Sequence, residues 1–221
     1  MNYPTLMTIF AHPDDETFSA GATLAKYAKH TNVYAVSIIK DPKREEEFNR
    51  ACKILGATPI QLEFKKISSC NFYKIKRKIE DLIREFKPKQ IITHVDFDYH
   101  HEHKKVRNIV EEAIEWVSHT TSDKEAFQVS SLWGAETTVL IPVPDIHIDT
   151  TDTHEDKLEA IKVYETQSHK GGENFYSKFH HSKSILRGVQ SSTNHAEAFQ
   201  VIPIKLTGSF KPIKVMDQFP Y

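Results

Sequence analysis

The chain has 221 residues, with 29 lysines and arginines against 30 aspartates and glutamates, so its formal net charge is −1. This length suits one α/β domain, or one domain with an elaboration at its C-terminal end. The balanced charge argues against a nucleic-acid or anionic-membrane partner, since such proteins usually carry a basic excess. No stretch approaches the roughly 18 apolar residues of a membrane span.

The N-terminal residues show no signal-peptide pattern, because a basic start and a long apolar run are both missing. The two cysteines, Cys52 and Cys70, form neither a metal-type pair nor a disulfide framework. Cys52 falls within a helical pattern and is expected to be a small buried hydrophobic residue. These features together predict a cytoplasmic protein.

Short apolar runs alternate with longer amphipathic segments along the first half of the chain. The predicted strands are residues 5–11, 32–39, 59–64 and 90–95, and the predicted helices are 16–29, 44–56, 71–86 and 104–117. Alternation of this length is typical of right-handed βαβ units. The sequence therefore predicts an α/β fold, a Rossmann-like three-layer α/β/α arrangement with a mostly parallel sheet.

The pattern is weaker beyond residue 118. Here we expect strands at 132–143 and 145–150, a helix at 154–167, a loop at 168–184 and a broken helix at 184–202. There is no internal repeat, low-complexity tract or linker. We expect a single domain over residues 1–221, with a Rossmann-like core over about 1–120 and a C-terminal elaboration over 121–221.

Two polar clusters follow predicted strands. The sequence AHPDDE (residues 11–16) comes after the first strand, and DFDYHHEH (residues 96–103) comes after the fourth. In an open parallel sheet, ligands bind in the crevice beyond the carboxyl ends of the strands. Both clusters are therefore expected at the same edge of the sheet, where they can form one site.

The residue types in these clusters suit a catalytic metal. His100 and His103 are three residues apart and project from the same side of a helical turn. With His12 and Asp15, His103 gives the two-histidine, one-carboxylate set of a catalytic Zn²⁺ site that keeps a position for water. Asp14 is then free to act as a general base, and His100 as a proton donor or oxyanion stabiliser. This set indicates metal-assisted hydrolysis of an amide or ester.

Simpler interpretations remain open for each residue alone. Asp14 or Asp15 can serve as an ordinary helix N-cap, and a histidine in a loop is usually just solvated. What favours the metal site is that both clusters follow the carboxyl ends of predicted parallel strands.

At this point the sequence resembles the PIG-L/LmbE-like de-N-acetylase family. AHPDDE is identical to the first motif of the family, and DYHHEH (residues 98–103) matches its D-Y-H-x-D-H pattern, with Glu102 in place of aspartate. The pattern R-x-x-E-x-x-x-A-x-x-x-L-G is present at residues 44–56, and RGVQSSTNHAEAF (residues 187–199) resembles a late family element. The resemblance covers about residues 5–200.

The resemblance implies a PIG-L/LmbE-like fold and a zinc-dependent enzyme that removes an acetyl group from N-acetylglucosamine-type units. Carried over by position, the zinc ligands are His12, Asp15 and His103, the general base is Asp14, and the second catalytic group is His100. Arg44 matches a residue that contacts the substrate. Asp98 is expected to orient an imidazole from behind the metal ligands.

Zn²⁺ is the expected cofactor, with Fe²⁺ or another divalent metal left open. The expected partner is a small N-acetylated amino sugar or glycoconjugate, whose acceptor pocket the C-terminal part would shape. A homo-oligomer is compatible with the family, whose members often assemble. Two alternatives stay open: a deacylase acting on another N-acyl amine, such as a thiol conjugate or a nucleotide-linked or glycan-linked sugar, and a non-catalytic relative.

Some positions depart from the family. The segment KDPKREEE (residues 40–47) replaces a glycine-containing turn, Thr166 and Gln167 replace Ser-Gln, and His195 replaces a tyrosine. His180 and His181 match no family role, so a surface loop is the simplest expectation for them.

Overall fold

The protein is described by a computed structural model over residues 3–69, 71–121, 124–167, 172 and 174–204. The strands are β1 (Leu6–Phe10), β2 (Val33–Ile39), β3 (Thr58–Phe64), β4 (Gln90–His94), β5 (Ser131–Ala135), β6 (Ile146–Asp149) and β7 (Ala196–Ile202). The helices are α1 (Asp15–Ala28), α2 (Glu45–Ile54), α3 (Phe72–Phe86), α4 (His101–Val117), α5 (His154–Val163) and α6 (Phe175–Ser191), with a 3₁₀ turn η1 at Glu165–Gln167.

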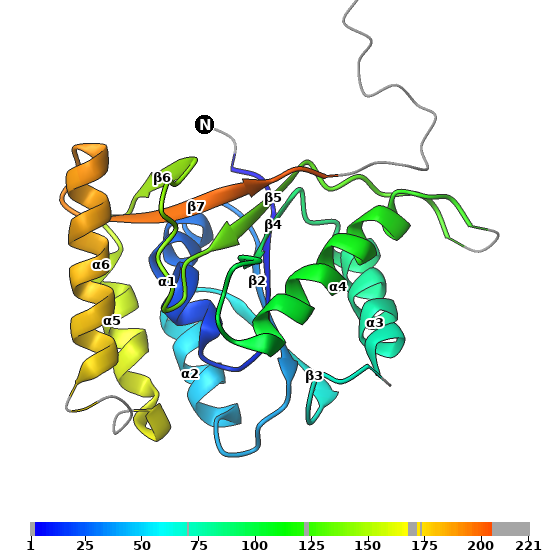
Figure 1. The fold of residues 1–221 in the computed structure, drawn as a ribbon, viewed down its shortest axis with the longest axis horizontal. Coiled ribbons are helices and arrows are strands. Elements are labelled where there is room, and N and C mark those ends of the chain that lie inside the picture. The colour runs from blue at the N-terminus through cyan, green and yellow to red at the C-terminus, as the bar shows by residue number, and fades with distance from the viewer. Residues whose placement is uncertain (1–2, 70, 122–123, 168–171, 173, 205–221) are drawn as a thin grey trace, which may run out of the picture.

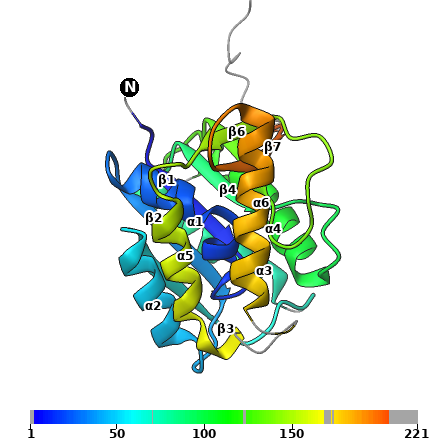
Figure 2. The same ribbon diagram turned by 90° about the vertical axis from the view of Figure 1, so that its left-hand side faces the viewer.

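The strands of the described residues form one seven-stranded sheet in the order β3-β2-β1-β4-β5-β7-β6. The first five strands of this order are parallel, whereas β7 runs antiparallel to both of its neighbours, β5 and β6. Helices α3 and α4 lie on one face of the sheet, and α1, α2, α5 and α6 lie on the other (Figures 1 and 2). The predicted three-layer α/β/α fold with a mostly parallel sheet is confirmed.

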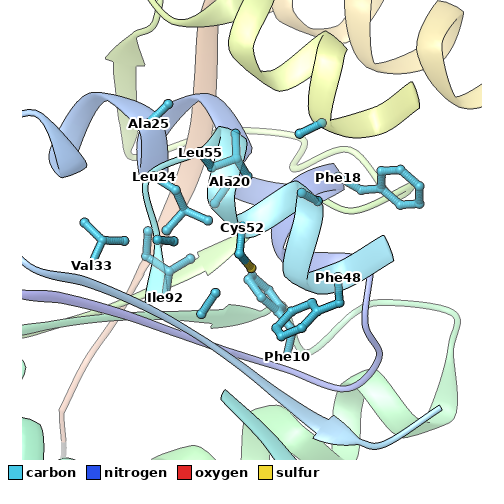
Figure 3. Close-up of a cluster of buried hydrophobic side chains, with 14 of the residues drawn as sticks. Phe10, Phe18, Ala20, Leu24, Ala25, Val33, Phe48, Cys52, Leu55 and Ile92 are labelled. Carbon is cyan, nitrogen blue, oxygen red and sulfur yellow. The ribbon is translucent and has the colours of Figure 1, made fainter. Parts of the chain in front are cut away.

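Each face of the sheet has its own apolar core. On one face, Phe18 and Leu24 of α1 pack with Phe48 and Cys52 of α2 and with Phe10 of β1 (Figure 3). On the other face, the isoleucines of α3 and the aliphatic residues of α4 cover Met7, Ile9 and Ile91. Strands β1, β2 and β4 are buried on both faces and read as mostly apolar runs, which is why they were recognisable from the sequence. Cys52 is buried as expected.

The C-terminal third differs from the expectation. The predicted loop at 168–184 overlaps α6, whose described part begins at Phe175, while residues 168–171 and 173 lie outside the described residues. The predicted broken helix at 184–202 is in fact the end of α6 followed by strand β7. The expected long strand at 132–143 ends at Ala135, and the expected helix at 154–167 ends at Val163 and continues as η1.

The two differences at α6 and β7 have a physical cause. The buried face of α6 consists of polar side chains such as Lys183 and Arg187, so it shows no apolar period of 3.6 residues. The β7 segment AEAFQVI is rich in helix formers, but its antiparallel pairing with β5 and β6 overrides that local preference.

Within the described ranges, no helix is both long enough and apolar enough to cross a membrane.

Candidate functional site

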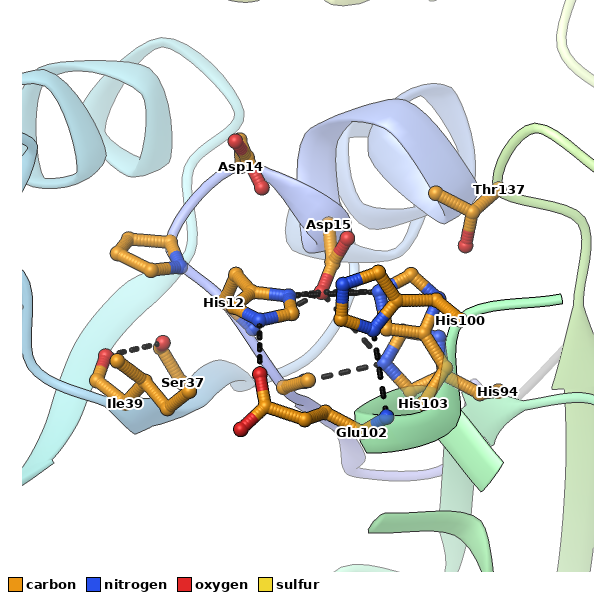
Figure 4. Close-up of polar contacts among 12 residues, drawn as sticks. His12, Asp14, Asp15, Ser37, Ile39, His94, His100, Glu102, His103 and Thr137 are labelled. Carbon is orange, nitrogen blue, oxygen red and sulfur yellow. Dashed lines mark hydrogen bonds and ion pairs between the residues drawn. The ribbon is translucent and has the colours of Figure 1, made fainter. Parts of the chain in front are cut away.

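The two polar clusters meet where the sheet reverses its strand order. β1 and β4 are adjacent and parallel, although residues 11–89 lie between them in the sequence, and the chain continues from β1 to β2 on the other side. His12 and Asp15 lie directly after β1, and His103 lies in the first turn of α4, after β4 (Figure 4). A crevice at such a switch point is the usual ligand site of open α/β sheets.

Three of the predicted residues present their ligand atoms to one point. His12 Nδ1 lies 3.2 Å from Asp15 Oδ2 and 3.3 Å from His103 Nε2. The third side of this triangle, from His103 Nε2 to Asp15 Oδ2, measures 3.4 Å. Asp15 also accepts a hydrogen bond of 2.9 Å from the backbone N–H of His12, which fixes the carboxylate in place.

The opposite nitrogen of each imidazole is held by a carboxylate. His103 Nδ1 lies 2.9 Å from Asp98 Oδ2, and His12 Nε2 lies 2.9 Å from Glu102 Oε2. A carboxylate behind an imidazole fixes the ring orientation and the tautomer, and turns the other nitrogen toward the centre of the site. Asp98, expected to orient an imidazole, thus lies against His103.

The charges of the three side chains are strongly coupled. Burial opposes ionisation of Asp15, but the nearby imidazoles of His103 and His12 hold the pKa of Asp15 well below its ordinary value. Burial likewise opposes protonation of His12, yet hydrogen bonds and charge from Asp15, together with Glu102, raise the pKa of His12 to about 9. The site therefore concentrates negative charge and attracts a cation, which would compete with protons for the imidazole nitrogens.

Asp14 lies apart from the three ligand side chains (Figure 4) and has a different partner from its neighbour Asp15. Its backbone has φ 143° and ψ −30°, a conformation that is strained for a residue with a side chain. Glu16 Oε2 accepts a hydrogen bond of 3.1 Å from the Asp14 backbone N–H, and Arg44 Nη1 donates one of 2.6 Å to Asp14 Oδ2. Burial and the charge of Asp15 raise the pKa of Asp14 to about 7, against the opposing charge of Arg44.

His100 caps the N-terminus of α4. Its Nδ1 accepts a hydrogen bond of 3.3 Å from the backbone N–H of Glu102, so in the neutral ring the hydrogen is on Nε2. The ring stacks on His103 with 4.5 Å between centroids. Burial and the charges of His103 and His12 lower the pKa of His100 below its ordinary value.

Some residues of the site were not predicted. His94, at the end of β4, is fully buried, stacks on His103 and places Nε2 3.5 Å from Asp15 Oδ2. Its Nε2 also accepts a hydrogen bond of 3.0 Å from the backbone N–H of Ala11, so this histidine helps to hold the loop after β1. The only signal in the sequence was a polar residue at the end of an apolar strand. Glu102 was noticed as a motif departure, but its contact with His12 was not anticipated.

A cavity of about 330 Å³ opens over these residues. It is lined by His12, Asp14, Asp15, Phe18, Arg44, Tyr99, His100, His103, Thr137, Thr138, Gln167 and Tyr176. The wall opposite the histidines thus comes from the segment after β5, from η1 and from α6, all of which belong to the C-terminal part of the chain.

Residues 7–114 match the family model described as PIG-L, GlcNAc-PI de-N-acetylase. The chain carries a PIG-L domain. This match contains both polar clusters and Arg44, and it confirms the family resemblance that the two motifs indicated.

Solved structures resemble the PIG-L domain and the segment that follows it. The N,N'-diacetylchitobiose deacetylase of Pyrococcus horikoshii is 17% identical with a TM-score of 0.77, and the match covers 90% of this chain and 84% of that one. The 4-carboxy-2-hydroxymuconate hydratase of Pseudomonas putida KT2440 is 17% identical with a TM-score of 0.76, and the match covers 94% of this chain and 99% of that one. The zinc-inhibited form of a teicoplanin deacetylase is 14% identical with a TM-score of 0.69, and the match covers 92% of this chain and 100% of that one.

At these identities the likeness establishes the fold. Because both deacetylases and a hydratase share it, the reaction has to be argued from the residues of the site and not from the fold.

Proposed function

We propose that this protein is a metal-dependent hydrolase that removes an N-acetyl group from an N-acetylglucosamine-type amino sugar or its conjugate. The observation that carries the proposal is the triangle formed by His12 Nδ1, Asp15 Oδ2 and His103 Nε2, with sides of 3.2, 3.3 and 3.4 Å. Ligands about 2.0–2.1 Å from a tetrahedral zinc ion lie roughly 3.3–3.4 Å apart, so the triangle fits three of its four positions.

The donor set also fits the metal in kind. Two imidazoles and one carboxylate, each oriented by a further hydrogen bond, are ligands that Zn²⁺ prefers, although Fe²⁺ and other divalent ions accept the same set. The teicoplanin deacetylase that shares this fold has been solved in a zinc-inhibited form, which associates zinc with such a protein. When bound, a divalent ion would supply Lewis acidity, which lowers the pKa of water toward neutrality and polarises an amide carbonyl.

Asp14 is the proposed general base. Its Oδ2 is occupied by Arg44 Nη1 at 2.6 Å, which leaves Oδ1 to accept the proton of the attacking water. A base performs best when its pKa lies near the working pH, and burial among acidic neighbours raises the pKa of Asp14 in that direction. The proton held at Asp14 can then pass to the leaving amine.

His100 is the proposed oxyanion stabiliser. Because its Nδ1 caps α4, its Nε2–H is the group available to donate a hydrogen bond toward the cavity. The lowered pKa of His100 favours the neutral ring, which suits a donor of this kind better than a general acid. Of the two roles that the sequence left open, the capping contact therefore favours oxyanion stabilisation.

Arg44 is proposed to serve both catalysis and binding. Its Nε donates to Asp41 Oδ2 at 2.9 Å and its Nη1 donates to Asp14, so contact with a substrate oxygen falls to Nη2. Tyr99 and Tyr176 line the same cavity and offer aromatic faces to a sugar ring. A cavity open to solvent suits a sugar carried on a larger acceptor.

The decisive experiment compares Asp14→Asn with the wild type after zinc loading. We expect unchanged metal content but acetate release from N-acetylglucosamine conjugates reduced by about 10²–10⁴-fold, the usual contribution of a general base. Asp41→Asn is the matched control, since it also removes a carboxylate from Arg44 but does not line the cavity.

Near-wild-type turnover in Asp14→Asn would refute the assignment of the base. A zinc-loaded wild type that releases acetate from none of a panel of N-acetylated amino sugars would refute the substrate class. The same panel, extended to thiol conjugates and to nucleotide-linked and glycan-linked amines with other acyl groups, separates the proposed activity from the alternative deacylases.

A further inference from the structure

A second group of histidines lies outside the cavity. His154 is the first residue of α5, His181 lies on α6, and His195 immediately precedes β7. One nitrogen from each ring lies within 4.8 Å of the other two, and His154 Nε2 lies 2.8 Å from His181 Nδ1. The rings of His154 and His195 stack with 3.8 Å between centroids. Two of these residues, His181 and His195, are ones for which the family motifs gave no role.

The tautomer of His195 is fixed by a neighbouring hydroxyl. Ser184 Oγ lies 2.8 Å from the carbonyl oxygen of His181 and 3.2 Å from His195 Nδ1. A carbonyl only accepts hydrogen bonds, so the single hydroxyl proton goes to His181 and Ser184 accepts from the ring. His195 therefore carries its hydrogen on Nδ1, which leaves the lone pair of Nε2 available as a ligand.

His154 is the buried member of the group, and one of its ring nitrogens has no partner within the described part of the chain. It is 1% exposed, and its Nδ1 is buried without a hydrogen-bond partner among the described residues. Its helix α5 packs beside α6 (Figure 2). By contrast, His181 is exposed and His195 is partly exposed, so an ion can approach from the solvent side.

We propose that His154, His181 and His195 form a second site for a divalent transition metal ion such as Zn²⁺, separate from the site in the cavity. Neutral imidazole is a good ligand for zinc, copper and nickel, and three histidines leave a fourth position for water. In the structure, His154 Nε2 and His181 Nδ1 lie 2.8 Å apart, so one of these two nitrogens carries a hydrogen that it donates to the other. Binding of the ion requires each ring to keep its hydrogen on the nitrogen away from the metal, and the partly exposed His195 ring to tilt out of its stack.

A metal in this position would join three elements of the C-terminal part of the chain. α5, α6 and the start of β7 each contribute one ligand, and α6 also contributes Tyr176 to the wall of the cavity. Because the ligands come together only in the folded chain, bound metal would stabilise the native state and hold that wall in place.

The test is a Zn²⁺ titration of the purified, chelator-treated full chain by calorimetry, with metal content measured after dialysis. We expect two equivalents for the wild type, one for His103→Ala, one for His181→Gln and none for the double variant. In the His103→Ala background, Zn²⁺ should raise the melting temperature, and His181→Gln should weaken binding at least about tenfold.

Two further variants guard against general effects. His119→Gln is the matched control, because it removes a partly exposed histidine that follows α4 and whose ring contacts Glu115 and Trp116. This variant should leave both equivalents intact. His195→Phe keeps an aromatic ring against His154 but removes a ligand, so it should also lose one equivalent.

The inference is overturned if His181→Gln and His195→Phe bind as much Zn²⁺ as the wild type, or if His103→Ala binds none while remaining folded. Because His103→Ala isolates the second site and acetate release reports the first, failure of either proposal can be distinguished from failure of the other.

Discussion

At the scale of single residues, His180 shows how burial without partners constrains a side chain. It is fully buried on α6, its ring stacks on Phe18 with 5.0 Å between centroids, and neither ring nitrogen has a hydrogen-bond partner among the described residues. Burial, together with the nearby charges of Lys183 and Lys157, holds the pKa of His180 well below its ordinary value. The expectation of a surface loop at this position was wrong.

We predict that His180→Phe makes the protein more resistant to acid. The unfolded histidine takes up a proton below about pH 6.5 whereas the folded one does not, so the wild type loses stability as the pH falls, by up to about 1.4 kcal/mol per pH unit. Phenylalanine has no such proton and keeps the stacking on Phe18. Urea denaturation at pH 8 and pH 5 should show the difference in unfolding free energy between variant and wild type growing toward pH 5. An equal difference at both pH values would contradict the prediction.

At the scale of elements, α6 is joined to the rest of the molecule by polar contacts. Lys183 Nζ donates to the carbonyl oxygens of Glu136 and Thr137 at 2.7 and 3.0 Å, and Arg187 pairs with the Glu136 carboxylate. Buried polar groups cost free energy unless they are paired, and Lys183 and Arg187 are paired. These bonds fix the position of the helix that carries Tyr176.

The turn from α6 into β7 depends on Gly188. A Cβ atom at this position would lie 2.6 Å from the backbone oxygen of Asn194 and 2.8 Å from that of Thr193, and backbone atoms in a tight turn cannot move aside easily. We predict that Gly188→Ala lowers the unfolding free energy by about 1–3 kcal/mol, as overpacking usually does. Ser182→Ala, at an exposed position of the same helix, should leave it nearly unchanged or slightly raised. Equal urea midpoints for the two variants would contradict the prediction.

At the scale of the whole molecule, the two parts of the chain share one sheet and one cavity. β5 pairs with β4 along its full length, Gln90–His94, and α5 packs on α1 and α2. The catalytic groups proposed here come from residues before 104, whereas Thr137, Gln167 and Tyr176 complete the cavity. The single-domain prediction over residues 1–221 therefore has a direct test.

We predict that a fragment of residues 1–130 does not fold cooperatively, while a fragment of residues 1–204 does. The shorter fragment exposes the unpaired edge of β4 and the apolar surface of α1, both of which favour aggregation. Circular dichroism during thermal unfolding, together with solubility, measures the outcome. A sharp transition in fragment 1–130 would show that the first part is an independent domain.

The sequence by itself determined the first four strand–helix units and the edge of the sheet on which both polar clusters lie. Strands buried on both faces appear as apolar runs, and the amphipathic helices between them keep their period, so local chemistry predicts local structure there. Once β1 and β4 are neighbours in the sheet, the motif positions bring His12, Asp15 and His103 together.

The tertiary structure alone decided the rest, because the remaining elements depend on contacts between residues distant in sequence. No periodic pattern in the sequence indicates the polar buried face of α6 or the antiparallel strand β7. The same holds for the contact of Glu102 with His12 and for the grouping of His154, His181 and His195. Most buried polar side chains need a partner, and that partner becomes known only when the chain is folded.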